Sequence, residues 1–116
     1  YQPRRCQVET NSLGQVFFDS LREKMKNNRL PVQLIGFTTT NESKEKIINN
    51  FQVAIQNNEV KILNDETLKI QMDVYECKVN NNAKHIYNAK QGYHDYCVIA
   101  TLLAYDCLTR KMSVIR

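Results

Sequence analysis

The pattern of apolar and polar positions along the chain predicts three long helices. Apolar residues recur at three- and four-residue spacings from about Leu13 to Asn27, from about Glu42 to Asn57, and within Gly92–Leu108. This spacing is the period of an amphipathic or nearly buried helix. The expected buried stripe of the first helix is Val16, Phe17, Leu21 and Met25, with Phe18 alongside. The expected buried positions of the second helix are Ile47, Ile48, Phe51, Ala54 and Ile55.

Two short apolar segments predict strands ahead of the first two helices. Cys6–Glu9 ends in a carboxylate, and Thr10–Ser12 supplies capping residues before Gly14, which allows close backbone approach. Val32–Phe37 is apolar enough to be mostly buried, and Thr38–Asn41 offers a second capping cluster. Alternation of strands and helices predicts an α/β fold, in which ligands and chemistry collect at the carboxyl ends of the strands.

The segments between the second and third helices are shorter. Val60–Leu63 predicts a short strand or an extended segment, and Asp65–Tyr75 predicts a weaker helix. Cys77–Val79 and His85–Asn88, joined by an asparagine-rich turn, predict a β-hairpin with a polar tip. After the third helix, Lys111–Arg116 is a candidate for a last extended piece.

Composition narrows the class of protein. The chain has 116 residues, of which 42% are hydrophobic and 24% are charged, as in one soluble globular domain with a modest core. No apolar run approaches the roughly 20 residues that a membrane-spanning helix requires. The net charge of +4 suits a polyanionic partner, although scattered basic residues on a solvated surface account for much of it. Lys44 and the Thr38–Ser43 loop could touch DNA phosphates, and a solvated helix start explains them equally well.

The four cysteines form no recognised metal-binding pattern. Cys6, Cys77, Cys97 and Cys107 contain no CxxC pair and no zinc-finger spacing, so we expect buried, reduced thiols in a cytosolic protein. Adding the two histidines to Cys77 and Cys97 gives four potential zinc ligands, but their spacings match no standard zinc module.

The start of the third helix carries the candidate chemistry. His94 and Asp95 are expected in its first turn, where unpaired N–H groups and the helix dipole favour an ionised carboxylate. Asp95 is therefore suited to bind a cation, and the alternative is that it only caps the helix. His94 could bind metal, orient Asp95 or shuttle a proton, or it could serve only to pack or cap. Glu9, taken alone, is more simply interpreted as an ordinary strand-end acid.

Three sequence motifs stand in a recognisable order. They are Val8-Glu9-Thr10-Asn11-Ser12-Leu13-Gly14-Gln15, then Phe37–Thr40 with Ser43-Lys44 ahead of a helix, then Gly92-Tyr93-His94-Asp95 opening an apolar helix. Together they resemble the nuclease domain of phage terminase large subunits, and the resemblance covers nearly the whole chain. It implies an α/β, ribonuclease-H-like (resolvase-like) fold, in which residues 1–116 form a single domain, the C-terminal part of the nuclease domain.

The resemblance also implies a function. It implies a metal-dependent endonuclease that cuts concatemeric double-stranded DNA during viral genome packaging, with a two-metal site for Mg²⁺ or Mn²⁺. The implied partners are double-stranded DNA, the portal protein, the small terminase subunit and an N-terminal ATPase domain, at the procapsid in the host cytoplasm and without a membrane. Glu9 corresponds to the family's second catalytic acid, and His94 and Asp95 match the start of its His-Asp-Asp motif. The implied catalytic residues are thus Glu9, His94 and Asp95, with Glu9 and Asp95 as metal ligands.

The sequence departs from the family pattern at two points. Tyr96 stands where the family has a second aspartate, and no acid precedes Glu9, whereas the family's first catalytic aspartate lies on an earlier strand. We therefore expect a sheet that is incomplete at its N-terminal side. Asp19, Asp65 and Asp73 lie in predicted helices and are expected to face solvent. The alternatives are a non-catalytic DNA-binding or assembly module of the same fold and a nuclease of the Holliday-junction-resolvase type.

Overall fold

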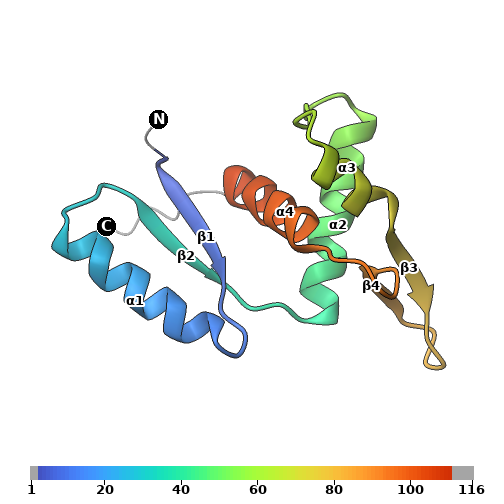
Figure 1. Cartoon of the computed structure of the whole chain (residues 1–116), viewed down its shortest axis with the longest axis horizontal. Helices are drawn as coiled ribbons and strands as arrows, with labels where there is room; N and C mark the ends of the chain where they lie inside the picture. The colour runs from blue at the N-terminus through green and yellow to red at the C-terminus, as the bar shows by residue number, and fades with distance from the viewer. Residues whose placement is uncertain (1–2, 111–116) are drawn as a thin grey trace. The chain divides into compact units, whose positions relative to one another are not determined.

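The computed structural model describes residues 3–110, which form four strands and four helices (Figure 1). In chain order the elements are β1 (Arg5–Glu9), α1 (Gly14–Asn27), β2 (Gln33–Phe37), α2 (Asn41–Gln56), α3 (Glu66–Asp73), β3 (Tyr75–Val79), β4 (His85–Ala89) and α4 (Tyr96–Thr109). Their contacts divide the chain into two compact units. Within the described residues the first unit comprises 3–39 and 103–110, and the second comprises 40–102. Helix α4 therefore contributes its first half to the second unit and its second half to the first.

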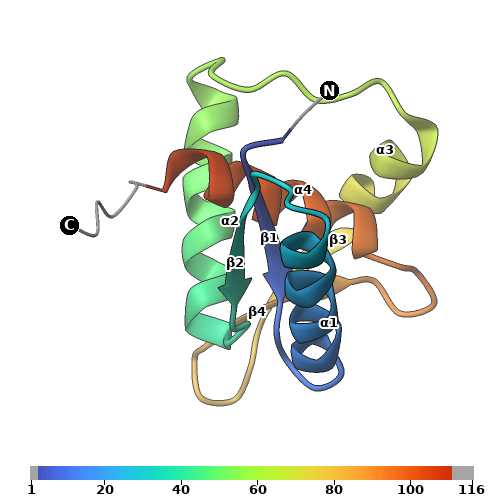
Figure 2. The ribbon, with the colours of Figure 1, turned by 90° about the vertical axis from the view of Figure 1, so that its left-hand side faces the viewer.

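The first unit is built on a parallel pair of strands. β1 and β2 pair in a register that runs from Arg5 opposite Gln33 to Glu9 opposite Phe37, which confirms both strands predicted in this region. Helix α1 connects them and lies alongside the pair (Figure 2). The carboxyl ends of the two strands therefore meet at the same edge, where Glu9 is the last residue of β1.

The predicted buried stripe of α1 is wrong in its first half. Val16 is 65% exposed and Phe17 is 60% exposed, whereas Phe18, Leu21 and Met25 are half-buried. Apolar residues in this helix occupy more of its circumference than one two-stranded sheet can cover. The side that carries Phe18, Leu21 and Met25 faces the strands, and the other apolar side is left in solvent.

Two side chains of β1 hold the second half of α4. Arg5 donates hydrogen bonds from Nη1 to the carbonyl oxygens of Cys107 (3.1 Å) and Arg110 (2.7 Å). Gln7 donates from Nε2 to the carbonyl oxygen of Leu103 (3.0 Å), and its Nε2 also reaches a carboxylate of the same helix. Because side chains alternate along a strand, Arg5 and Gln7 lie on one face of β1, and this face carries α4.

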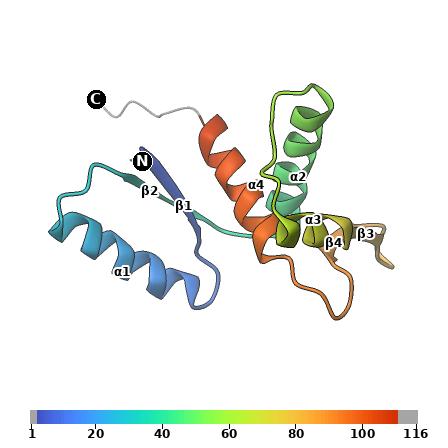
Figure 3. The same cartoon turned by 45° about the horizontal axis from the view of Figure 1, so that its top comes forward.

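In the second unit, α2, α3 and the β3–β4 hairpin gather around the first half of α4 (Figure 3). The buried apolar residues of this unit come from all of these elements and are Ile47, Ile48, Phe51, Ala54, Leu68, Tyr87, Val98 and Leu102. Four of the five positions predicted to be buried in α2 are confirmed. Ile55 is the exception, because it is 40% exposed. A capping box between Thr40 and Ser43 starts α2, as its capping cluster predicts.

The remaining elements of the second unit follow the sequence pattern with small differences. The antiparallel β3–β4 hairpin is confirmed, and α3 begins after Asp65, whose side chain accepts a hydrogen bond from the Leu68 N–H (2.9 Å). Residues 60–63 form neither a strand nor a helix, so the predicted strand is wrong there. The predicted extended piece at Lys111–Arg116 lies outside the described residues. Among the residues that the structure describes, no helix is long and apolar enough to cross a membrane.

The cysteines differ in their surroundings. Cys107 is buried, and this burial raises the pKa of its thiol. Cys6 and Cys97 are half-buried. The prediction of buried thiols is wrong for Cys77, which is exposed on β3.

Candidate functional site

Glu9 lies at the carboxyl end of β1, on the same face of the strand as Arg5 and Gln7. Its side chain is half-buried. Within residues 3–110 no group donates a hydrogen bond to its carboxylate, and no basic side chain forms an ion pair with it. The first unit thus presents a carboxylate whose oxygen atoms are available to an external ligand.

The turn after Glu9 is tied to the end of β2 by paired hydrogen bonds. Asn11 donates from Nδ2 to the Thr39 carbonyl oxygen (2.7 Å), and the Thr39 N–H donates to Asn11 Oδ1 (2.7 Å). The Thr10 N–H donates to the Phe37 carbonyl oxygen (2.9 Å). The prediction that Thr10–Ser12 caps the helix is wrong, because the N-cap position is Leu13 and has no side-chain hydrogen bond. These polar residues hold the ends of β1 and β2 together instead.

Gly14 is required by the backbone of Glu9. A Cβ atom at position 14 would collide with the carbonyl oxygen of Glu9, so only glycine allows the helix to start this close to the strand end. The predicted close backbone approach is therefore confirmed, and it fixes the position of Glu9 relative to α1.

Asp95 occupies the N-cap position of α4. Its carbonyl oxygen accepts the first helical hydrogen bond, from the Ile99 N–H (2.9 Å), so Asp95 precedes the first turn in which it was predicted. An N-cap aspartate ordinarily accepts a hydrogen bond from the second or third N–H of the helix. Cys97 is the second residue of α4, and its N–H donates instead to Gln71 Oε1 of α3 (2.7 Å). No group in the described part of the chain donates a hydrogen bond to the Asp95 carboxylate.

The Asp95 carboxylate lies close enough to Tyr75 to affect its ionisation. Burial raises the pKa of the Tyr75 phenol, and the negative charge of Asp95 raises it further, as does neighbouring Tyr87. The Tyr75 hydroxyl also contacts the Tyr87 carbonyl oxygen (3.4 Å). Lys44 Nζ is 5.8 Å from the centroid of the Tyr75 ring. Tyr75 therefore has both the Asp95 carboxylate and the Lys44 ammonium as neighbours.

His94 and Tyr96 flank Asp95 and are both exposed. Their rings lie against each other, with centroids 5.8 Å apart and an interplanar angle of 47°. Tyr96 is the first residue of α4 and is 61% exposed. A side chain at position 96 therefore points into solvent beside His94.

The predicted site residues are divided between the two units. Glu9 belongs to the first, whereas His94 and Asp95 belong to the second. Within the described ranges, no three histidine, cysteine, aspartate or glutamate side chains form a group that could hold a metal ion. The donor chemistry of the two carboxylates nevertheless fits Mg²⁺, which keeps several waters and is bound through one or two carboxylates. Asp19, Asp65 and Asp73 are exposed, as predicted.

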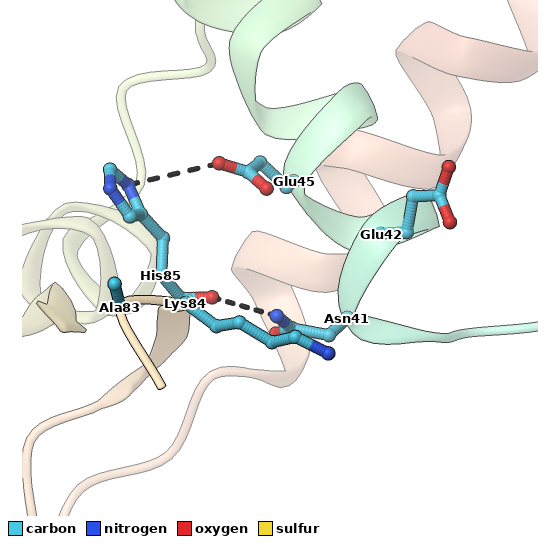
Figure 4. Close-up of a pocket in the computed structure, with 6 residues that line it drawn as sticks. All are labelled: Asn41, Glu42, Glu45, Ala83, Lys84 and His85. Atoms are coloured by element: carbon cyan, nitrogen blue, oxygen red, sulfur yellow. Dashed lines mark hydrogen bonds and ion pairs between the residues drawn. The ribbon is translucent and has the colours of Figure 1, made fainter. Parts of the chain in front are cut away.

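The second unit also contains an open pocket of about 480 Å³ (Figure 4). It is lined by Asn41, Glu42, Glu45, Ala83, Lys84 and His85. His85 Nδ1 lies 3.7 Å from Glu45 Oε1, and Asn41 donates a hydrogen bond to the His85 carbonyl oxygen (2.9 Å). The pocket carries two glutamates, one lysine and one histidine, and none of the predicted site residues lines it.

Sequence patterns did not indicate Gln71, the residue that takes the place of Asp95 in capping α4. A glutamine in a short, weakly amphipathic helix is ordinarily a surface residue, and nothing in the local sequence signals a partner 26 positions away. Only the packing of α3 against α4 brings the two residues together.

Comparisons with known proteins give one result at the level of structure. No family model matches the sequence, and no curated protein matches it. The chain is similar to the crystal structure of the large terminase nuclease from the thermophilic phage G20c with bound magnesium, with a TM-score of 0.62 and 19% sequence identity. The match covers 76% of this chain and 46% of that one. The chain therefore has a mixed α/β fold of the kind seen in that nuclease and spans about half of its length.

Proposed function

We propose that this chain is part of the metal-dependent endonuclease domain of a viral DNA-packaging terminase, with a ribonuclease-H-like fold, and that it cuts concatemeric double-stranded DNA. The observation that carries the proposal is the combination of this fold with two carboxylates, Glu9 and Asp95, that have no hydrogen-bond partner in the described chain. Carboxylate oxygen atoms without a partner in the chain are the kind of ligand that Mg²⁺ takes in proteins.

Two divalent ions, Mg²⁺ or Mn²⁺, would supply the activation of water and the stabilisation of the leaving oxygen. Glu9 of the first unit and Asp95 of the second are the residues that would hold them. His94 is exposed beside Asp95, and its proposed role is to bind the metal, orient Asp95 or shuttle a proton. Lys44 would contact a DNA phosphate from the Tyr75 side.

The wider setting belongs to the same proposal. A domain of this function would work with an N-terminal ATPase domain, a portal protein and a small terminase subunit, at the procapsid in the host cytoplasm. The missing first carboxylate would then be supplied by a strand outside residues 1–116, since the match covers about half of the related nuclease.

The test is plasmid cleavage by the full-length protein in Mg²⁺ and in Mn²⁺. Glu9→Ala and Asp95→Ala should each reduce cleavage at least about 100-fold, because each removes a charged ligand for which no neighbour substitutes. Matched controls are Glu23→Ala and Asp73→Ala, which remove exposed helical acids of the same two units and should leave cleavage unchanged. Undiminished cutting by both site variants would rule out the assignment.

A non-catalytic DNA-binding or assembly module is the second candidate. It is favoured by Tyr96, which puts an aromatic ring where the resembling family has a second aspartate. Salt-dependent DNA binding with no metal-dependent cleavage by the full-length protein would support this candidate. A nuclease of the resolvase type would instead cut branched DNA in preference to linear duplex.

A further inference from the structure

Gln71 is a buried polar residue at the centre of the second unit. Its side chain is on α3, it is only 5% exposed, and its amide oxygen accepts the Cys97 N–H at 2.7 Å. Cys97 is the second residue of α4, so its N–H is one of the groups that a helix leaves without an internal partner. Gln71 therefore caps a helix to which it does not belong.

This arrangement changes what Asp95 can do. An aspartate at the N-cap position normally uses its carboxylate to accept this N–H or the next one, that of Val98. In the described residues Gln71 accepts the Cys97 N–H, and the Asp95 carboxylate accepts neither. Its charge remains next to the positive end of the helix dipole, and its oxygen atoms remain open to another partner.

We propose that Gln71 is a positioning residue that relieves Asp95 of helix capping and so keeps its carboxylate available to a divalent cation. The inference rests on the proposed function for the identity of the ligand. An amide suits the role because it accepts a hydrogen bond without adding charge, so the cation is attracted by Asp95 alone. In the absence of this amide, Asp95 would turn to the Cys97 N–H and compete with the cation for its own oxygen atoms.

Melting temperatures test, without metal, whether Asp95 caps α4 when the Gln71 amide is removed. Gln71→Met keeps the volume and the unbranched shape of the side chain but removes the strong acceptor, and Gln52→Met is a control at an exposed position on α2. In the full chain we expect Asp95→Ala to change the melting temperature little. In the Gln71→Met background the same substitution should lower it by a further 4–8 °C or so, the shift produced by losing one helix cap in a domain of this size.

The effect of Gln71 on cation binding is measured as the affinity for Mn²⁺, which broadens the amide NMR signals around Tyr96 when it binds. Gln71→Met should weaken Mn²⁺ binding about 10-fold to 100-fold, as the loss of groups that orient metal ligands does. Gln71→Glu, which keeps an oxygen acceptor for the Cys97 N–H, should bind Mn²⁺ at least as well as the wild type. Weaker Mn²⁺ binding by Gln71→Met at a temperature where this variant is fully folded would not follow from a purely structural role for Gln71.

The outcomes separate the two proposals. If Mn²⁺ binding is lost in Asp95→Ala but unchanged in Gln71→Met, and the melting shifts are additive, the inference on Gln71 is overturned and the proposed function stands. If neither variant affects Mn²⁺ binding, both are overturned. Weakened binding in Gln71→Met with rescue in Gln71→Glu and non-additive melting shifts supports both.

Discussion

At the scale of single residues, Tyr96 is one of the two points at which this chain departs from the pattern of the family it resembles. It lies in the first turn of α4, exposed and beside His94. Tyr96→Asp would add a second carboxylate there, which the helix dipole stabilises by about 0.3–1 kcal/mol. We expect tighter Mn²⁺ binding and a melting temperature no lower than that of the wild type. Tyr93→Asp, an equal charge change at a residue that is 53% exposed and outside the helix, is the control. Equal effects of the two variants would contradict a specific role for position 96.

The residues of the candidate site were predictable from sequence to different degrees. Glu9 and Asp95 follow local rules, since each stands where a strand or a helix changes into a turn. The hydrogen bonds at the starts of α1 and α4 could not be predicted from neighbouring residues in the sequence. Asn11 was expected to cap α1 and instead binds Thr39, while α4 is capped by Gln71. An N–H group is satisfied by whichever acceptor the tertiary structure brings within reach, and sequence spacing does not contain that information.

At the scale of elements, the periodicity of apolar residues predicted every helix and strand to within a few residues, apart from the predicted strand at residues 60–63, which does not form. It did not predict which face of α1 is covered. Val16 and Phe17 share the helical period with the covered residues, and only the width of the two-stranded sheet decides between the faces. Periodicity thus identifies an element reliably, whereas burial depends on how much surface its neighbours provide.

The turn from β1 into α1 leads to a prediction at the same scale. Replacing glycine by alanine inside a helix ordinarily stabilises a protein by about 0.4–1 kcal/mol. At Gly14 the new methyl group would meet the Glu9 carbonyl oxygen, so the sign should reverse. We expect Gly14→Ala to lower the free energy of unfolding by about 1–3 kcal/mol, the usual cost of overpacking, in urea titrations of the full chain.

The same substitution should also move Glu9 and reduce metal-dependent cleavage. Ser20→Ala, at an exposed position in the middle of α1, is the matched control and should not destabilise the chain. A Gly14→Ala variant as stable as the wild type would show that the strand end tolerates displacement, and the close approach would then have no bearing on the position of Glu9.

At the scale of the whole molecule, charge is unequally shared between the two units. Residues 3–39 and 103–110 contain seven basic and four acidic residues, a net charge of +3, whereas residues 40–102 contain seven and eight, a net charge of −1. Lys111 and Arg116, outside the described residues, account for the rest of the +4 of the chain. The two units contain equal numbers of described basic residues, and the difference comes from the smaller number of acids in the unit that carries Glu9. Non-specific DNA binding depends on such charge, because each neutralised phosphate releases counterions.

This asymmetry predicts which lysines bind DNA. Lys24 and Lys26 are exposed near the end of α1 in the positive unit, and Lys61 and Lys69 are exposed in the second unit. Removing a lysine that binds a phosphate should reduce the slope of log affinity against log salt by about one. We therefore expect the double variant Lys24→Gln, Lys26→Gln to reduce the slope by up to about two, measured by fluorescence anisotropy with duplex DNA across a salt series. The double variant Lys61→Gln, Lys69→Gln, which removes the same charge, should leave the slope nearly unchanged. If both variants change it equally, net charge alone controls binding, and the positive unit is not the one that binds DNA.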